Sequence, residues 1–116
     1  MLAHTPLHQL VDRTTLEPWR TLLLDSADRI ERQGHAKHEL CNADGAVCFR
    51  GALLNAKNYC DCVRPSPTFY KAENRMVKFL GFTYGEVIDW NNAPERTAEE
   101  VITAMRACAL QGISYE

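Results

Sequence analysis

The chain has 116 residues, 46% of them hydrophobic and 24% charged, and a formal net charge of −2 at pH 7. These are ordinary values for one globular domain of about 100–150 residues. The charge gives no indication of nucleic-acid binding, which favours a basic face, and no apolar run approaches the ~20 residues of a membrane span. We therefore predict one domain, with neither a membrane nor a nucleic acid as its partner.

The N-terminal stretch, residues 1–14, contains Pro6 and scattered apolar residues. It lacks the basic segment and apolar block of a signal peptide, so we expect no export. Its composition is compatible with an extended arm or with one short helical segment from Pro6 to Val11. We predict an N-terminal arm over residues 1–14 and a single helical domain over residues 15–116.

The five cysteines are many for a chain of this length, and their number is odd. A secreted disulfide framework usually has an even set. Together with the expected lack of an export signal, this favours a cytoplasmic protein. In that reducing compartment thiols stay free, and most are buried as small apolar groups.

A first long helix is predicted over Leu16–Gln33. Thr15 is a suitable N-cap, Pro18 is tolerated in the first turn, and Gly34 is a natural stop. One face carries apolar residues at helical spacing, namely Trp19, Leu22, Leu23, Ala27 and Ile30. The opposite side carries two pairs with the i,i+4 spacing of ion pairs, Asp25/Arg29 and Asp28/Arg32.

The polar stretch His35–Asp44 follows, and Asn42–Gly45 (Asn-Ala-Asp-Gly) is typical of a turn. Short apolar segments flank this turn, which favours a small β-hairpin near residues 38–48. The alternative is a loop that leads directly into a helix. Apolar residues at helical spacing then predict a second, short helix over Val47–Lys57.

A third helix is predicted between Ser66, its N-cap, and Gly81, its stop, with Pro67 in the first turn. The connection after it, Phe82–Asp89, is expected to be irregular, with one extended segment at Glu86–Asp89.

The last helix has the clearest start. Thr97 and Glu100 have the spacing of a capping box, so the helix is predicted from Ala98 to Leu110, and Gly112 ends it. Helices with one apolar face and short connections bury those faces against one another. The predicted fold class is therefore mainly α, a compact four-helix domain with or without the small β-hairpin near residues 38–48.

Two blocks of the sequence resemble a known family. They are Asp44-Gly45-Ala46-Val47-Cys48-Phe49-Arg50-Gly51-Ala52-Leu53 and Asp89-Trp90-Asn91-Asn92-Ala93-Pro94-Glu95-Arg96-Thr97-Ala98-Glu99-Glu100-Val101-Ile102. They are similar to the patterns D-G-x-x-C-x-x-G-A-L and W-N-D-x-P-x-R-T-x-E-E-V of a small domain of unknown function from actinobacteria, related bacteria and their phages. The resemblance covers roughly residues 16–109, and this chain has Asn92 where members usually carry Asp.

The resemblance implies no activity. It implies a soluble protein in the cytoplasm of a bacterium or of a phage-infected host. It also implies that the side chains Trp90, Asn91, Pro94, Arg96 and Thr97 act as a unit.

Two interpretations of the second block are open. In the first it is scaffolding: Trp90 fills the core, Asn91 and Asn92 close a turn, and Arg96 lies near the cap of the last helix. In the second it is a polar pocket, in which Asp89, Asn91, Arg96 and the free N–H groups of a helix start hold an anion. The scaffolding interpretation is favoured, because one Arg at a helix start is a weak signal for an anion site.

The chain also contains residues of the types that bind zinc, which would be His38, Cys41, Cys60 and Cys62. Their spacing is poor, since no C-x2-C pair is present. We therefore expect no cofactor, with zinc as the alternative.

Cys48 could act as a nucleophile, because a helix start lowers a thiol pKa and His38 could serve as its base across the hairpin. The favoured interpretation is a small core residue. A contact surface is also predicted, from Arg64, Phe69, Tyr70 and Lys71, because Arg and Tyr are common interface anchors.

These observations favour a small non-enzymatic accessory or regulatory protein that binds a larger protein or protein complex. A phage-encoded inhibitor of a host or defence protein would fit the size and the setting. The alternative is a protein that binds a small ligand such as an anion or nucleotide, or zinc, at residues 89–97 or at the His/Cys set.

Overall fold

The computed structural model describes residues 5–54 and 65–113. Within these ranges the helices are α1 (Leu7–Leu10), α2 (Pro18–Gln33), α3 (Phe49–Leu53), α4 (Pro67–Leu80), α5 (Tyr84–Asn92) and α6 (Ala98–Leu110), with a 3-10 helix over Arg13–Thr15. The prediction of a mainly α fold is confirmed. None of the described helices combines the length and the apolar character needed to cross a membrane.

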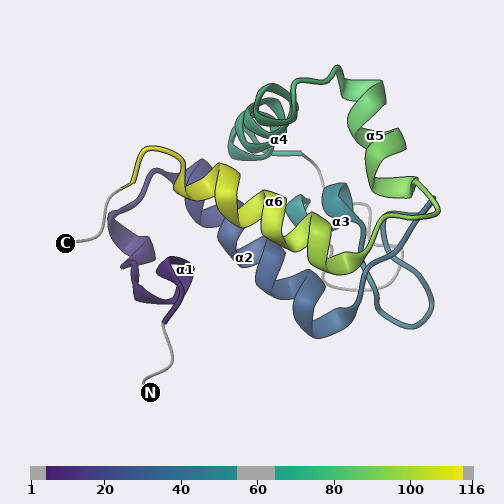
Figure 1. Cartoon of the computed structure of the whole chain (residues 1–116), viewed down its shortest axis with the longest axis horizontal. Helices are drawn as coiled ribbons and strands as arrows, with labels where there is room; N and C mark the ends of the chain where they lie inside the picture. The colour runs from purple at the N-terminus through teal and green to yellow at the C-terminus, as the bar shows by residue number, and fades with distance from the viewer. Residues whose placement is uncertain (1–4, 55–64, 114–116) are drawn as a thin grey trace.

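Helix α2 is the centre of the molecule and contacts α3, α4 and α6. Figure 1 shows α6 lying along α2 and running in the opposite direction, with α4 and α5 on one side. The predicted apolar faces meet in one core, whose fully buried side chains include Leu23, Leu24, Ile30, Phe49, Phe69, Met76, Val101 and Met105. Burial of these faces is what holds short helices together, because isolated helices of this length are marginal in water.

Local signals located most of the helix boundaries. Ser66 caps α4 with its Oγ, which accepts a hydrogen bond from the Phe69 N–H, and Gly81 ends that helix with φ 76°. The Thr97–Glu100 capping box at α6 is present as predicted. The predicted cap of α2 is wrong: α2 begins at Pro18 after Glu17, and the Thr15 hydroxyl donates to the carbonyl of Asp12 instead.

The connection after α4 also differs from the prediction. Phe82–Asp89 was expected to be irregular, but α5 begins at Tyr84. Thr83 and Glu86 form a second capping box, in which each side chain accepts a hydrogen bond from the other residue's backbone N–H. This T-x-x-E signal stabilises the helix start. The helix forms although its apolar residues do not follow a clear helical pattern, because most of its surface is exposed.

The α2–α3 loop, residues 34–48, contains no β-strand and only a minimal form of the predicted β-hairpin, in which Cys41 and Val47 make an antiparallel bridge across the turn and the Asn42 N–H donates to the Ala46 carbonyl. It forms two isolated bridges, from Val47 to His35 and to Cys41. The predicted turn is present, because the Asn42 carbonyl accepts a hydrogen bond from the Gly45 N–H and Gly45 has φ 88°. Directly after the Cys41–Val47 bridge the chain enters α3. The start of α3 is two residues later than predicted.

The acidic side of α2 pairs with distant residues and not within the helix. Arg13 contacts both Asp25 and Asp28, at 2.7 and 2.6 Å, and Arg106 of α6 contacts Asp28 at 2.9 Å. Arg29 is buried and donates to Gln33 at 2.7 Å. Ion pairs within α2 were therefore the wrong prediction. Asp28 instead joins α2 to α6 and to the segment before α2.

Replacing Asp28 with asparagine is expected to make the stability less dependent on pH on the acid side. Burial alone would raise the pKa of Asp28, but hydrogen bonds and charges from Arg13 and Arg106 hold that pKa below its usual value. Such a carboxylate stabilises the fold above its unfolded pKa of about 3.9, and this contribution is lost as the pH falls through the folded pKa.

Urea unfolding from neutral pH down to about pH 3 measures this effect. The variant should lose about 1 kcal/mol at neutral pH, as for a partly exposed ion pair, and should lose less than the parent on acidification. Asp89→Asn is the control, because Asp89 is exposed and has no ion pair among the described residues. Equal acid sensitivity in the parent and in Asp28→Asn would contradict the prediction.

Candidate functional site

The best-defined site lies where the α2–α3 loop meets the end of α5, and Asn91 is its centre. Asn91 is 4% exposed. Its Oδ1 accepts a hydrogen bond from the Phe49 N–H at 3.2 Å and lies 2.8 Å from His35 Nε2, which donates in the tautomer protonated there. Its Nδ2 donates to the Ala36 carbonyl at 3.3 Å and to Asn92 Oδ1 at 2.9 Å. One side chain therefore ties α5 to the loop and to α3.

The neighbouring residues extend this connection. Asn92 Oδ1 also accepts a hydrogen bond from the His38 N–H at 2.8 Å, and Lys37 Nζ donates to the carbonyls of Ala93 and Pro94 at 2.7 and 3.1 Å. His38 has φ 66°, a left-handed conformation that costs a non-glycine residue about 1–3 kcal/mol. The hydrogen bonds of the Lys37 side chain and of the His38 N–H offset that cost and hold the loop in place.

The start of α3 depends on Cys48 and Gly51. Cys48 Sγ accepts a hydrogen bond from the Gly51 N–H at 3.2 Å, so the thiol acts as the N-cap. The Leu40 carbonyl accepts from the Cys48 N–H at 3.0 Å and lies directly against Gly51, where an added Cβ would be 1.9 Å from that oxygen. Only glycine allows the loop to approach α3 this closely.

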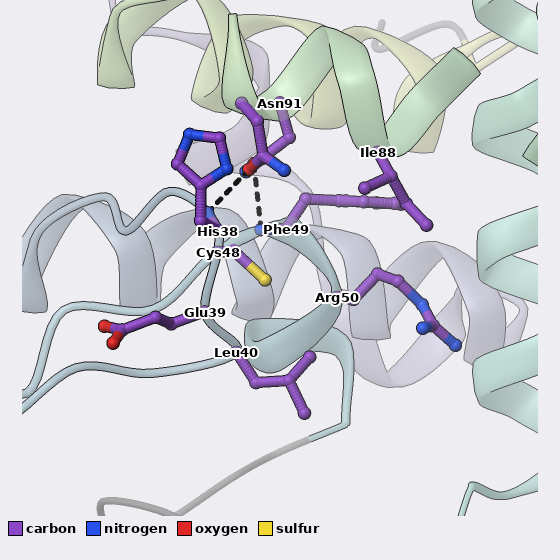
Figure 2. Close-up of a pocket in the computed structure, with 9 residues that line it drawn as sticks. His38, Glu39, Leu40, Cys48, Phe49, Arg50, Ile88 and Asn91 are labelled. Carbon is purple, nitrogen blue, oxygen red and sulfur yellow. Dashed lines mark hydrogen bonds between the residues drawn. The ribbon is translucent and has the colours of Figure 1, made fainter. Parts of the chain in front are cut away.

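A pocket of about 180 Å³ opens beside this junction, lined by His38, Glu39, Leu40, Cys48, Phe49, Arg50, Ile88, Asn91 and Asn92. Figure 2 shows Ile88 on the α5 side, Leu40 on the loop side, and the Cys48 sulfur between them. Leu40 and Ile88 are 42% and 43% exposed. The pocket therefore has a polar wall that is held firmly and two large apolar side chains at its rim.

Arg50 is the positively charged residue of this pocket. Its Nε donates to Glu73 Oε2 at 2.6 Å, and its guanidinium lies 5.4 Å from the centre of the Phe69 ring. Glu73 is 5% exposed, so the acid that holds Arg50 is fixed in the interior. Within residues 5–54 and 65–113, the two terminal nitrogens of Arg50 have no hydrogen-bond partner, and they remain able to bind an acidic group.

The side chains of the second sequence block, Asp89–Ile102, do not all face the same part of the molecule. Arg96 Nε donates to the Trp90 carbonyl at 2.9 Å, its Nη1 pairs with Glu100 at 3.1 Å, and its guanidinium lies 5.0 Å from the centre of the Trp90 ring. Asn91 faces the loop, and Asp89 is exposed. No hydrogen bond or ion pair joins Asp89, Asn91 and Arg96 in the described structure, and Asn91 and Arg96 bind different partners, so the anion pocket stays a prediction.

Trp90 has a smaller part in the core than predicted. It is only partly buried and packs against the core from its edge, whereas Trp19 is the fully packed tryptophan, with 3% exposure. The scaffolding role of the block is carried instead by the asparagine pair.

The contact surface predicted at the start of α4 loses one of its residues to the core. Phe69 is 1% exposed and belongs to the core, so this residue was wrongly placed at a surface. Its ring meets that of Tyr70 edge to face, with 5.2 Å between the centres. Tyr70 and Lys71 are exposed, and Arg64 lies outside the described residues.

The zinc hypothesis is not tested, because the described residues include only two of its four ligands. Among the described residues, no three His, Cys, Asp or Glu side chains are grouped so that they could hold a metal ion. His38 is exposed, Cys41 is buried, and Cys60 and Cys62 lie outside the described residues. The four-residue zinc set therefore stays a prediction.

The nucleophile hypothesis for Cys48 needs a lowered thiol pKa, and the surroundings of Cys48 have the opposite effect. Burial raises the pKa of the Cys48 thiol, although the N–H groups of Gly51 and Arg50 act in the opposite direction. His38 does line the same pocket. A raised pKa keeps the sulfur as a neutral thiol at neutral pH, and thiols react through the thiolate. Cys48 is therefore a buried cap of α3, close to the favoured interpretation.

Arg50, Leu40 and Ile88 were not identified as site residues from the sequence. The available signal was indirect: Arg50 lies inside the first block, and Ile88 lies directly before the second. That the two blocks meet at one pocket follows only from the fold.

Comparison with known proteins agrees with the family resemblance. Residues 14–111 match the family model described as a family of unknown function (DUF6197). No curated protein and no solved structure is detectably similar to the chain. Because the match covers most of the chain, the protein belongs to this family of unknown function.

Proposed function

We propose that this member of the DUF6197 family is a binding protein that holds a segment of a larger protein, with one apolar side chain of that segment inserted in the pocket beside Asn91. The exposed pair Leu40 and Ile88 carries this proposal. Single exposed apolar residues are normal on a protein surface. Two of them on opposite sides of one pocket offer an apolar collar for an inserted side chain.

The size of the pocket favours one side chain over a larger ligand. An apolar cavity of about 150 Å³ accommodates a benzene molecule, so about 180 Å³ is enough for a leucine, methionine or phenylalanine side chain. Pockets that bind drug-sized ligands are about 300–1,000 Å³. A nucleotide would therefore fit poorly.

The charged side chains at the pocket rim indicate which residue of the partner segment should lie next to its inserted apolar residue. Arg50 is oriented by Glu73 and has two terminal nitrogens available among the described residues. An Arg held in this way is suited to a carboxylate, which it can bind through two parallel hydrogen bonds. Glu39 lines the same pocket and repels acids. The partner segment is therefore expected to place an Asp or Glu on the Arg50 side.

The setting implied by the resemblance, a bacterium or its phage, makes bacterial proteins the first partners to test. A phage-encoded inhibitor of a host or defence protein is one form of this proposal. The alternative of an anion or other small ligand at residues 89–97 has less support, because Arg96 is engaged by Glu100 and by the Trp90 carbonyl. The zinc alternative at the His/Cys set is untested.

A peptide library displayed on phage and selected on the full chain tests the proposal. We expect enrichment of peptides in which Leu, Met or Phe lies close to Asp or Glu, and a synthetic peptide of this kind then serves as the probe. Ile88→Asp should weaken its binding about tenfold or more, because a charge replaces the apolar collar. Arg50→Gln should remove the preference for the acidic residue.

Leu10→Asp is the matched control, because Leu10 is 42% exposed and lies on α1, away from α5 (Figure 1). It should bind the peptide as the parent does. Thermal unfolding of each variant separates lost binding from lost folding. An unenriched library, or peptide binding that Ile88→Asp leaves unchanged, would overturn the proposal.

A further inference from the structure

Another pocket, of about 280 Å³, lies between the start of α2, the second half of α4 and the end of α6. Its lining consists of Trp19, Arg75, Lys78, Phe79, Cys108 and Gln111. None of these residues lines the pocket beside Asn91. Figure 1 shows the start of α2 and the end of α6 close together, on the side of the molecule away from α5.

The charge around this pocket is mainly positive. Arg75 and Lys78 are exposed, and neither forms an ion pair among the described residues. Arg75 is also oriented: its guanidinium lies 4.8 Å from the centre of the buried Trp19 ring, and Arg20 lies 4.5 Å from the same ring. Glu17, the acid at the start of α2, pairs with Arg20 at 3.1 Å, so within the described ranges it is not paired with Arg75 or Lys78.

The helix dipoles of α2 and α6 do not cancel the positive charge around the pocket. Trp19 is the second residue of α2, so the positive end of that helix dipole is near the pocket. The end of α6 is negative, but Arg20 donates to the carbonyls of Ala109 and Gln111 there, at 2.9 and 2.8 Å. Burial raises the pKa of Cys108 to about 11, so this thiol adds no negative charge at neutral pH.

We infer that this pocket binds a small phosphorylated molecule, with its phosphate on Arg75 and Lys78 and its organic part against Phe79. An Arg and a Lys together supply the forked and the single donors with which proteins bind phosphate. Phe79 is 36% exposed and offers an apolar wall. This inference is independent of the peptide pocket, because no lining residue is shared.

Tryptophan fluorescence can report on this site directly. The chain has two tryptophans, so Trp90→Phe leaves Trp19 as the reporter. A ligand that draws Arg75 away from the indole changes the emission of Trp19. Phenyl phosphate is the probe, titrated at constant ionic strength, with inorganic phosphate and sodium chloride titrated in parallel.

We expect a saturable change in emission with phenyl phosphate, weaker binding of inorganic phosphate, and no saturable change with chloride. Arg75→Gln and Lys78→Gln should each weaken binding of phenyl phosphate about tenfold, which corresponds to the loss of one charged contact. Lys71→Gln is the matched control: Lys71 is an exposed cation of the same helix and does not line the pocket.

The substitutions of Arg75, Lys78 and Lys71 change exposed side chains, so thermal unfolding should show these variants folded. Isothermal calorimetry on the unmodified chain gives a second measurement that does not depend on a tryptophan. A response that follows ionic strength alone, or equal losses in Lys71→Gln and Lys78→Gln, would overturn the phosphate site. Equal affinities for phenyl phosphate and inorganic phosphate would overturn the assignment of Phe79 to an organic group.

Discussion

Asn91→Ala should lower the free energy of unfolding by about 3 kcal/mol. The substitution leaves the buried Phe49 N–H and the Ala36 carbonyl without their partner, and each unsatisfied buried group costs about 1–3 kcal/mol. It also removes the contact to His35. Urea unfolding measures the loss, and amide hydrogen exchange should show the α2–α3 loop losing protection first.

Asn74→Ala is the control for this substitution. Asn74 lies on α4, is only partly buried, and has no side-chain hydrogen bond among the described residues. Its replacement should change the stability by no more than about 0.5 kcal/mol. Asn91→Asp should also be unstable at neutral pH, since it buries a charge facing the Ala36 carbonyl, and should recover partly as acid protonates that carboxyl. Equal losses in Asn91→Ala and Asn74→Ala would refute the central role of Asn91.

Gly51→Ala should cost about 3 kcal/mol or prevent folding. The added Cβ would lie 1.9 Å from the Leu40 oxygen and 2.7 Å from its carbonyl carbon, and these are backbone atoms that cannot rotate away. Overpacking costs about 1–3 kcal/mol even where flexible side chains can adjust. The loop must therefore shift, and with it Leu40 at the pocket rim. Thermal unfolding measures the cost, and binding of the selected peptide measures the shift.

Gly85→Ala is the opposite case on the same chain. Gly85 lies in α5, and a Cβ there would meet nothing within 4 Å. Alanine favours the helix and reduces the freedom of the unfolded chain, so this variant should be more stable by about 0.4–1 kcal/mol. If both glycine substitutions were tolerated equally, the close approach of the loop to Gly51 would be wrong.

The features that the sequence predicted correctly are those determined by neighbouring residues. Ser66 with Pro67 and Thr97 with Glu100 mark helix starts within one turn of chain, and the structure has both. Helix α5 was missed although Thr83 and Glu86 carry the same kind of signal. Its apolar pattern is weak because much of its surface is exposed, so period alone could not identify it.

The features that the sequence could not predict join distant residues. Asn91 bonds to Phe49, 42 positions away, and to His35, 56 positions away. The scaffolding interpretation of the asparagines gave them a structural role, as observed. It placed their contacts within a local turn, whereas they bind residues far away in the sequence. Arg13 and Arg106 took the place of partners within α2 for the same reason: the fold brought better-placed cations to Asp28.

The way in which the α2–α3 loop is anchored also determines how the sequence of this protein can vary. Asn91 and Asn92 grip main-chain atoms of residues 36, 38 and 49, and every amino acid except proline presents the same main-chain groups. These contacts therefore do not depend on which side chains residues 36, 38 and 49 carry, whereas the side chains of His35 and Lys37 add contacts of their own. The length of the loop is fixed more strictly, because one inserted or deleted residue moves each of those main-chain atoms out of reach, so relatives should keep the spacing of the loop.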